Sequence, residues 1–225
     1  MILSIRKSMK ILMCFVALTT LSFSTQSVKA QDSNLPSAEP EQIAVVKEIE
    51  GSPEIHREGN VLAAESGSAL LEGDELVTKA SDRILLELAS DKSLLKINYD
   101  STIRLQKGIE PRELLGQARQ KENQELSVFL VRGLIWGKKI LTEPPALNIR
   151  TSVAVLAVRG TEFFLKTVSE NISEIVVKEG TVDIAYDNFG VQAGDLSRVF
   201  MEKGKKPRVE GVSEDDLAAW VQAFA

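Results

Sequence analysis

Ile84-Leu85-Leu86-Glu87-Leu88 and Leu95-Lys96-Ile97-Asn98-Tyr99 flank the polar tetrapeptide Ala89-Ser90-Asp91-Lys92. The second of these segments alternates apolar and polar residues, which is the period of a β-strand with one buried face. The tetrapeptide has the composition of a turn. This stretch therefore predicts a β-hairpin in which Leu95, Ile97 and Tyr99 face a hydrophobic core.

The same pattern extends over most of the chain, from about residue 43 to residue 200. Short apolar stretches rich in β-branched residues are separated by Gly, Asp, Asn and Ser. Glu179-Gly180 is expected to form a tight hairpin turn, because Gly adopts positive φ without strain. The spacing predicts an all-β fold, either a sandwich or a rolled double sheet. Further strands are expected at residues 103–105, 127–136, 149–158, 162–168, 174–178, 181–186 and 196–200.

Two segments depart from this pattern. Residues 110–125 are polar and contain Pro111, and we interpret them as a solvated arm, with a functional lid as the alternative. Residues 201–225 are expected to form a linker and a short amphipathic helix. Ser213 suits the N-cap, acidic residues 214–216 suit the first turn, and the apolar positions recur at helical spacing. These positions are Leu217, Trp220, Val221 and Phe224. We expect them either to pack on the β domain or to contact a partner.

The first 30 residues have the features of a cleavable secretory signal. A basic start is followed by the apolar run Ile11 to Phe23, and Val28-Lys29-Ala30 supplies small residues before a cut after Ala30. An uncleaved anchor is the alternative, but the run is shorter than the roughly 20 residues that span a bilayer. Cys14 lies inside this run, where lipid attachment is not expected. Residues 31–42 are expected to be a flexible leader.

Composition narrows the functional classes. The chain has one His and one Cys, so metal sites, Cys nucleophiles and His-based acid–base chemistry have almost no donors. Its net charge is −5. Signal removal would take away four cationic and no acidic residues, which lowers the charge to −9. Such a surface has no general attraction for nucleic acid or anionic lipid. We expect no cofactor and no nucleic-acid partner.

Few residues suggest catalysis or ligand binding. Gly73-Asp74 and Gly194-Asp195 each precede an apolar strand, and turn chemistry explains both aspartates better than a glycosidase carboxylate pair. His56 alone cannot form a metal site, so a surface histidine is expected. Trp136 is expected to cap the core beside a small basic patch formed by the lysines at 138 and 139, with a sugar-stacking platform as the alternative.

Arg159-Gly160-Thr161-Glu162-Phe163 has a structural and a functional interpretation. Gly160 suits a backbone bend or a close approach, while Thr161 and Phe163 suit a strand. The motif is then a structural turn. In the functional interpretation, Arg159 contacts an anion or a partner.

The ordered set of motifs resembles the FecR domain, the periplasmic module first defined in ferric-citrate signal transducers of Gram-negative bacteria. The most diagnostic element is residues 159–163, which is similar to the family's Arg-Gly-Thr-x-Phe signature. The resemblance runs from about Val45 to Phe200. Its other elements are Val46 to Gly51, Leu71 to Thr78, the hairpin Ile84 to Tyr99, Val131 to Leu134, Ile149 to Val155, Val177 to Val182 and Ala193-Gly194-Asp195.

The resemblance implies a β-rich, non-enzymatic domain outside the cytoplasmic membrane that acts by binding and conformational signalling. Founding members precede this domain with a cytoplasmic anti-sigma segment and a membrane helix, whereas in this chain we expect a cleavable signal there and no later membrane span. The family-motif residues are expected to be structural: Gly73, Asp74, Arg159, Gly160, Thr161, Phe163, Gly180, Gly194 and Asp195.

The leading hypothesis is thus a periplasmic or secreted regulatory module that recognises an envelope protein, with Leu217, Trp220, Val221 and Phe224 as possible contacts. The alternative is a structural protein that binds peptidoglycan or polysaccharide, which would need a row of exposed aromatic residues. An enzyme of the cupin or glycosidase type is the least favoured, because it needs a convergent cluster of titratable groups.

Overall fold

Alternating burial along the strands determines the architecture. The structure is a computed structural model that describes residues 41–107, 126–139, 147–186 and 189–224. Every second residue of β6 is buried, and β7 follows it through the Ala89–Lys92 turn as its antiparallel partner. The predicted hairpin is therefore confirmed. Leu95 and Ile97 are fully buried, but Tyr99 is 45% exposed because β7 ends at Ile97, so its expected core position is wrong.

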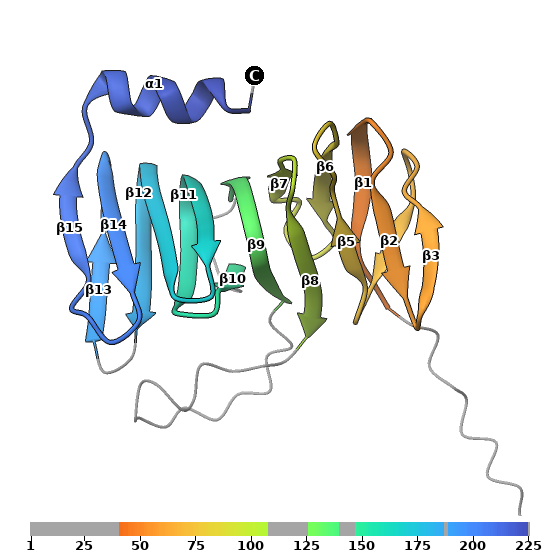
Figure 1. Cartoon of the computed structure of the whole chain (residues 1–225), viewed down its shortest axis with the longest axis horizontal. Helices are drawn as coiled ribbons and strands as arrows, with labels where there is room; N and C mark the ends of the chain where they lie inside the picture. The colour runs from red at the N-terminus through yellow and green to blue at the C-terminus, as the bar shows by residue number, and fades with distance from the viewer. Residues whose placement is uncertain (1–40, 108–125, 140–146, 187–188, 225) are drawn as a thin grey trace, which may run out of the picture. The chain divides into compact units, whose positions relative to one another are not determined.

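The described residues form fifteen strands and one helix (Figure 1). The strands are β1 (Gln42–Glu50), β2 (Glu54–Arg57), β3 (Asn60–Ala63), β4 (Ala69–Leu71), β5 (Glu75–Val77), β6 (Arg83–Leu88), β7 (Leu94–Ile97), β8 (Thr102–Lys107), β9 (Leu126–Lys138), β10 (Leu147–Arg150), β11 (Val155–Ser169), β12 (Ile172–Tyr186), β13 (Phe189–Ala193), β14 (Ser197–Glu202) and β15 (Arg208–Gly211). The helix is α1 (Glu214–Gln222). The predicted all-β class and C-terminal helix are confirmed.

Strand pairing divides the sheet into two layers. The first layer has the order β4-β1-β6-β7-β9-β11-β12-β14-β15. The second has the order β3-β2-β5-β8-β9-β10-β11-β12-β13. Inward-facing residues of both layers belong to one buried apolar cluster, so the core lies between the layers. Of the two arrangements that the strand spacing allowed, a sandwich and a rolled double sheet, the shared strands make this the rolled double sheet.

Three long strands, β9, β11 and β12, belong to both layers. Each bends at a glycine with positive φ and continues into the other layer: Gly133 in β9, Gly160 in β11 and Gly180 in β12. Strands that switch sheets through such bends form the corners of packed double sheets. Gly180 is therefore a bend inside one strand, and the predicted hairpin turn at Glu179-Gly180 is wrong. The actual turn between β11 and β12 lies at Glu170-Asn171.

Some expectations fall outside the described residues. The proposed signal, most of the leader and the whole 110–125 arm lie there. The sequence did not predict β15, which adds a strand to the first layer where a linker was expected. In the described part of the chain, no helix is long and apolar enough to cross a membrane.

Candidate functional site: the face covered by the C-terminal helix

The two Gly-Asp steps hold turns in separate hydrogen-bond networks. Asp74 is 1% exposed, pairs with Arg57 at 2.7 Å, and accepts the Leu71 N–H at 2.7 Å. Asp195 is exposed and accepts the Gly180 N–H at 2.6 Å, which ties the β12 bend to the turn before β14. Asp74 thus bonds a backbone group of its own turn, and Asp195 bonds a backbone group of the β12 bend. The two form no shared carboxylate pair of the kind that glycoside hydrolysis needs.

The signature motif lies on β11 around the bend at Gly160. Thr161 is buried, and its Oγ1 lies 2.8 Å from both the Arg159 and the Thr181 carbonyl oxygens. Phe163 is fully buried, and a Cβ at Gly137 would lie 2.3 Å from its ring. Arg159 is exposed. The motif therefore contributes its Thr and Phe to the β11–β12 pair and the core, and leaves its Arg at the surface.

Helix α1 begins at a capped N-terminus and packs on the outer face of the first layer. Ser213 Oγ accepts the Asp216 N–H at 3.1 Å, and the first turn is acidic, as the helix dipole favours. The Phe224 and Trp220 rings lie 5.7 and 6.0 Å from the Phe164 ring. Leu217 also packs in this cluster, which includes Val176 of β12. The apolar side of the helix thus packs on the β domain, which was the first of the two expected arrangements.

The C-terminal end of the helix is fastened by polar groups of the β6–β7 hairpin. Lys96 Nζ donates to the Phe224 carbonyl at 2.8 Å, and Asn98 Nδ2 donates to the Ala223 carbonyl at 2.7 Å. The last carbonyls of a helix have no partner within it, and a cation there is favoured by the dipole. Both contacts join residues about 125 positions apart in sequence, so no local pattern could have predicted them.

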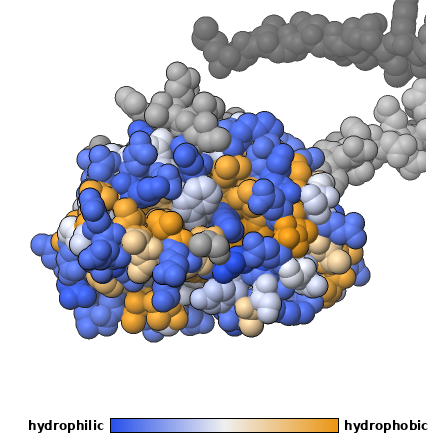
Figure 2. All heavy atoms as spheres, turned by 90° about the horizontal axis from the view of Figure 1, so that it is seen from above, coloured by the Kyte–Doolittle hydropathy of each residue, from blue (hydrophilic) through white to orange (hydrophobic). Residues whose placement is uncertain are grey.

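A groove of about 400 Å³ opens beside this end of the helix. We call it the α1 groove. Figure 2 looks down on this side of the molecule and shows apolar side chains exposed among hydrophilic ones. Val221 of α1 is 45% exposed at the groove. The lining residues are Glu48, Leu85, Leu94, Lys96, Trp136, Glu162, Phe164, Lys178, Val221 and Phe224.

Glu162 is the polar centre of the α1 groove. It accepts from the Trp136 Nε1–H at 3.2 Å and from Lys178 Nζ at 2.8 Å. Burial raises the pKa of Glu162, but the hydrogen bonds from Lys178 and Trp136 outweigh it and hold the pKa below its ordinary value. Glu162 is therefore an ionised, paired carboxylate and not a free general acid. The signature motif already contained this residue, at its variable position.

Trp136 and the neighbouring lysines lie in other surroundings than the sequence suggested. Trp136 lies on the outer face of the sheet beneath α1 and does not cap the inner core. Lys139 is 3% exposed and pairs with the buried Asp91, and Lys138 lies 3.8 Å from Glu162. The expected basic patch is thus absent, because its lysines are paired with carboxylates. Lys139 and Asp91 are 48 residues apart, which hides the pair from local sequence analysis.

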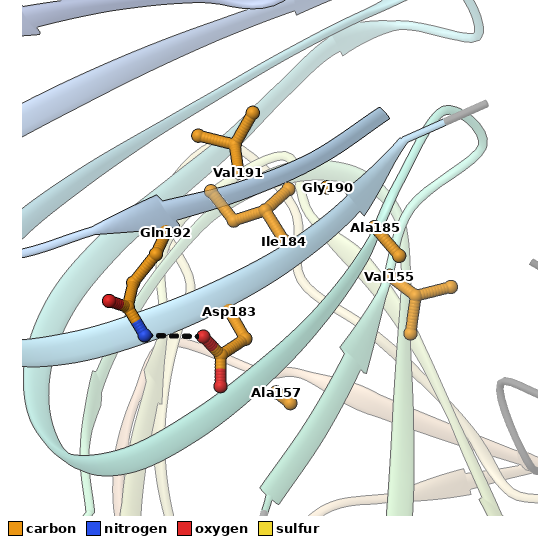
Figure 3. Close-up of a pocket in the computed structure, with 8 residues that line it drawn as sticks. All are labelled: Val155, Ala157, Asp183, Ile184, Ala185, Gly190, Val191 and Gln192. Atoms are coloured by element: carbon orange, nitrogen blue, oxygen red, sulfur yellow. Dashed lines mark hydrogen bonds between the residues drawn. The ribbon is translucent and has the colours of Figure 1, made fainter. Parts of the chain in front are cut away.

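A second pocket, of about 490 Å³, lies along β11, β12 and β13 (Figure 3). Its walls are mostly small or aliphatic residues such as Val155, Ala157 and Ala185. Among the described residues that line it, Asp183 is the one carboxylate, and it accepts a hydrogen bond from Gln192 at 2.8 Å. The described lining residues thus include no group of convergent titratable side chains of the kind that catalysis needs.

Metal chemistry has no visible basis in the described residues. His56 lies on β2 and contacts Glu54 at 3.3 Å. Among residues 41–107, 126–139, 147–186 and 189–224, no group of three or more His, Cys, Asp or Glu side chains could hold a metal ion.

Comparisons with known proteins agree with this architecture. Two crystal structures of a candidate anti-sigma factor from Parabacteroides distasonis ATCC 8503, at 1.65 and 2.50 Å resolution, superpose with TM-scores of 0.51 and 0.52 at 13% identity. Each match covers 66% of this chain and 64% of the other, so the chain spans somewhat less than two thirds of those proteins. At this identity the likeness concerns the fold alone. No curated protein matches the sequence significantly.

The family itself is identified by sequence. Residues 74–183 match the family model described as FecR protein. This segment lies within the longer stretch, Val45 to Phe200, in which the motifs occur, and it contains the bends of β9, β11 and β12. Residues 74–183 of the chain therefore belong to the FecR family.

Proposed function

We propose that this chain is an exported, non-enzymatic regulatory module of the cell envelope, which recognises a protein partner through the α1 groove. Its N-terminal 30 residues would direct export and be removed, and residues 31–41 would be a leader, one residue shorter than expected because β1 begins at Gln42. The β domain would act in the periplasm or outside the cell without a cofactor. The FecR family match and the likeness to a candidate anti-sigma factor support a signalling role.

The observation that carries the proposal is an exposed apolar groove at the end of a helix. Protein interfaces combine aromatic and aliphatic anchors with a polar rim whose charges are paired. The α1 groove has both: Trp136, Phe164 and Phe224 are aromatic, and Glu162 is already neutralised by lysines. A partner could therefore cover Glu162, the polar centre of the groove, without leaving that carboxylate unpaired.

The experiment compares two variants with the same chemical change. Val221→Gln alters the groove, and Val61→Gln alters an exposed valine of β3 outside it. Gln is a good helix former, so α1 is expected to remain folded. Residues 31–225 of each form would be immobilised, and a protein captured from the source organism's envelope extract would be purified and titrated. We expect Val221→Gln to weaken its binding at least about tenfold, which corresponds to about 1.4 kcal/mol, and Val61→Gln to have no effect.

Co-sedimentation with purified sacculi separates the two candidate roles. Binding to sacculi with no protein captured would replace the regulatory role with envelope attachment. Equal binding by both variants would remove the α1 groove from the proposal. The variant comparison is preferable to truncation after Gly211, because loss of α1 would expose Phe164 and Val176 and create a nonspecific apolar surface.

A further inference from the structure

Strand β15 is an open edge of the first layer. It pairs with β14 on one side and with no other described strand, and it lies at the left end of the row of strands in Figure 1. All four of its residues are exposed, and Val209 is 51% exposed. An open edge of this kind is a template for pairing with another strand.

The hydrogen-bond register shows which groups the edge offers. The Val212 N–H donates to the Leu196 carbonyl at 2.8 Å. Along an antiparallel ladder, every second residue pair exchanges backbone hydrogen bonds. Glu210 and Arg208 are therefore bonded like Val212, and direct their backbone groups toward Arg198 and Phe200 of β14. The N–H and C=O groups of Val209 and Gly211 consequently point to the open side.

We propose that β15 pairs antiparallel with β15 of a second copy of this chain, about a two-fold axis at Val209. This register places Arg208 opposite Glu210 of the second copy, and Glu210 opposite its Arg208. The two Val209 residues exchange backbone hydrogen bonds, and each Gly211 N–H meets the carbonyl of the other Pro207. Proline lacks an N–H, so it occupies a position where only its carbonyl is needed.

Charge complementarity selects this register over its neighbours. The neighbouring registers with the same bonding pattern are shifted by two residues. One of them places Glu210 opposite Glu210, and the other places Arg208 opposite Arg208. Opposite charges directly across an antiparallel pair stabilise it, and like charges destabilise it. A shift by a single residue would place the charged side chains of one strand on the same side of the sheet as the apolar side chains of the other.

The side chains are already positioned for such a pair. Arg208 lies over the Phe200 ring, 5.1 Å from its centroid, on the outer face of the layer. Val209 is opposite the buried Val199, at the edge of the core, where the second Val209 would cover it. The two β15 strands would end, at Gly211, about 14 Å apart along the pair, and each acidic first turn of α1 lies beyond that end, so salt screens their repulsion.

Sedimentation equilibrium of residues 31–225 tests this inference, which does not depend on the α1 groove. We expect wild-type protein to show reversible dimerisation at concentrations up to about 100 μM, a range suited to weak interfaces. Arg208→Glu places four carboxylates at the contact, and Glu210→Arg places four guanidinium groups there. Each variant alone should dimerise at least about tenfold more weakly.

The decisive sample is an equimolar mixture of these two variants. In a mixed dimer Glu at position 208 faces Arg at 210, and Glu210 faces Arg208, so both contacts become complementary again and dimers should return. Val209→Pro removes an outward N–H without disturbing the β14 ladder and should also yield monomers. A monomeric wild type, or single variants that dimerise as well as wild type, would overturn the proposal, and so would a mixture that stays monomeric.

Discussion

Lys139→Met is expected to lower the free energy of unfolding by about 3–5 kcal/mol at pH 7, because it leaves a buried carboxylate without its cation. The Lys139 side chain is fully buried, and that of Asp91 is 6% exposed. Asp91 also accepts from the Ser93 hydroxyl at 2.7 Å and the Ser93 N–H at 3.0 Å. The pair joins the turn of the β6–β7 hairpin to the end of β9. Urea unfolding of residues 31–225 measures the change.

The pH dependence of this variant has a defined sign. Burial raises the pKa of Asp91, but hydrogen bonds from Lys139 and Ser93 outweigh it and hold the pKa below the ordinary value. A lowered carboxyl pKa contributes stability above the unfolded pKa, near 4, and that stability is lost as pH falls through the folded pKa. Without Lys139, burial prevails and Asp91 protonates more readily. The difference between wild type and Lys139→Met should therefore shrink at pH 3.

Two further variants make the result specific. Lys205→Met removes an exposed lysine that pairs with Glu202, and should change stability by less than about 1 kcal/mol. Asp91→Leu combined with Lys139→Met should recover most of the loss, because no buried charge remains. A cost below about 1 kcal/mol for Lys139→Met, or one equal at pH 7 and pH 3, would show that the pair does not hold the hairpin.

Gly180→Ala is the second substitution with a large expected effect, about 3 kcal/mol or more. Gly180 has a φ of +93°, and an added Cβ would lie 2.3 Å from the Gly160 carbonyl oxygen and 2.9 Å from Thr161 Cα. Both neighbours are backbone atoms at the bend of β11, so they cannot move aside as a side chain would. The positive φ costs about 1–2 kcal/mol, and relief of the overlap costs about 1–3 kcal/mol more.

Gly59→Ala separates these two contributions. Gly59 has a φ of +80° in the turn between β2 and β3, with no atom within 4 Å of an added Cβ. It should show only the cost of the positive φ, about 1–2 kcal/mol. Equal losses for the two variants in urea unfolding would mean that overlap of the added Cβ at position 180 with the β11 backbone adds no cost to that of the positive φ.

Local patterns were enough for the class of fold. Alternation in residues 84–97 reports which side chains face a core, and the spacing of short apolar runs reports the double sheet. The capped and amphipathic 213–224 segment likewise predicted α1. The FecR motifs were recognisable because they coincide with turns and bends that restrict residue type, such as Gly160.

The errors arose where distant partners decide the structure. Lys178-Glu179-Gly180-Thr181 has the composition of a hairpin turn, but pairing with β11 on both sides of Gly180 makes it a bend inside β12. Tyr99 continues the alternation, yet the strand ends before it and the ring stays exposed. Lys139 has the sequence context of a surface cation, but in the folded chain it is buried and paired with Asp91.

The candidate site was less predictable than the fold. The apolar residues of α1 could be named, because their helical spacing is local. The groove that Val221 borders also requires β1, β6, β7, β9, β11 and β12 to come together. Lys96 and Asn98 look like the polar positions of an exposed strand face, and only the folded chain brings them to the end of α1.

Photo-crosslinking in living cells tests the central claim, recognition of an envelope protein at the α1 groove, most directly. A benzophenone amino acid would replace Val221 in one strain and Val61 in another, because both positions are exposed and apolar but only the first borders the groove. We predict one protein adduct that forms on irradiation at position 221 and not at position 61. No protein adduct at position 221, or the same adducts at both positions, would contradict the account.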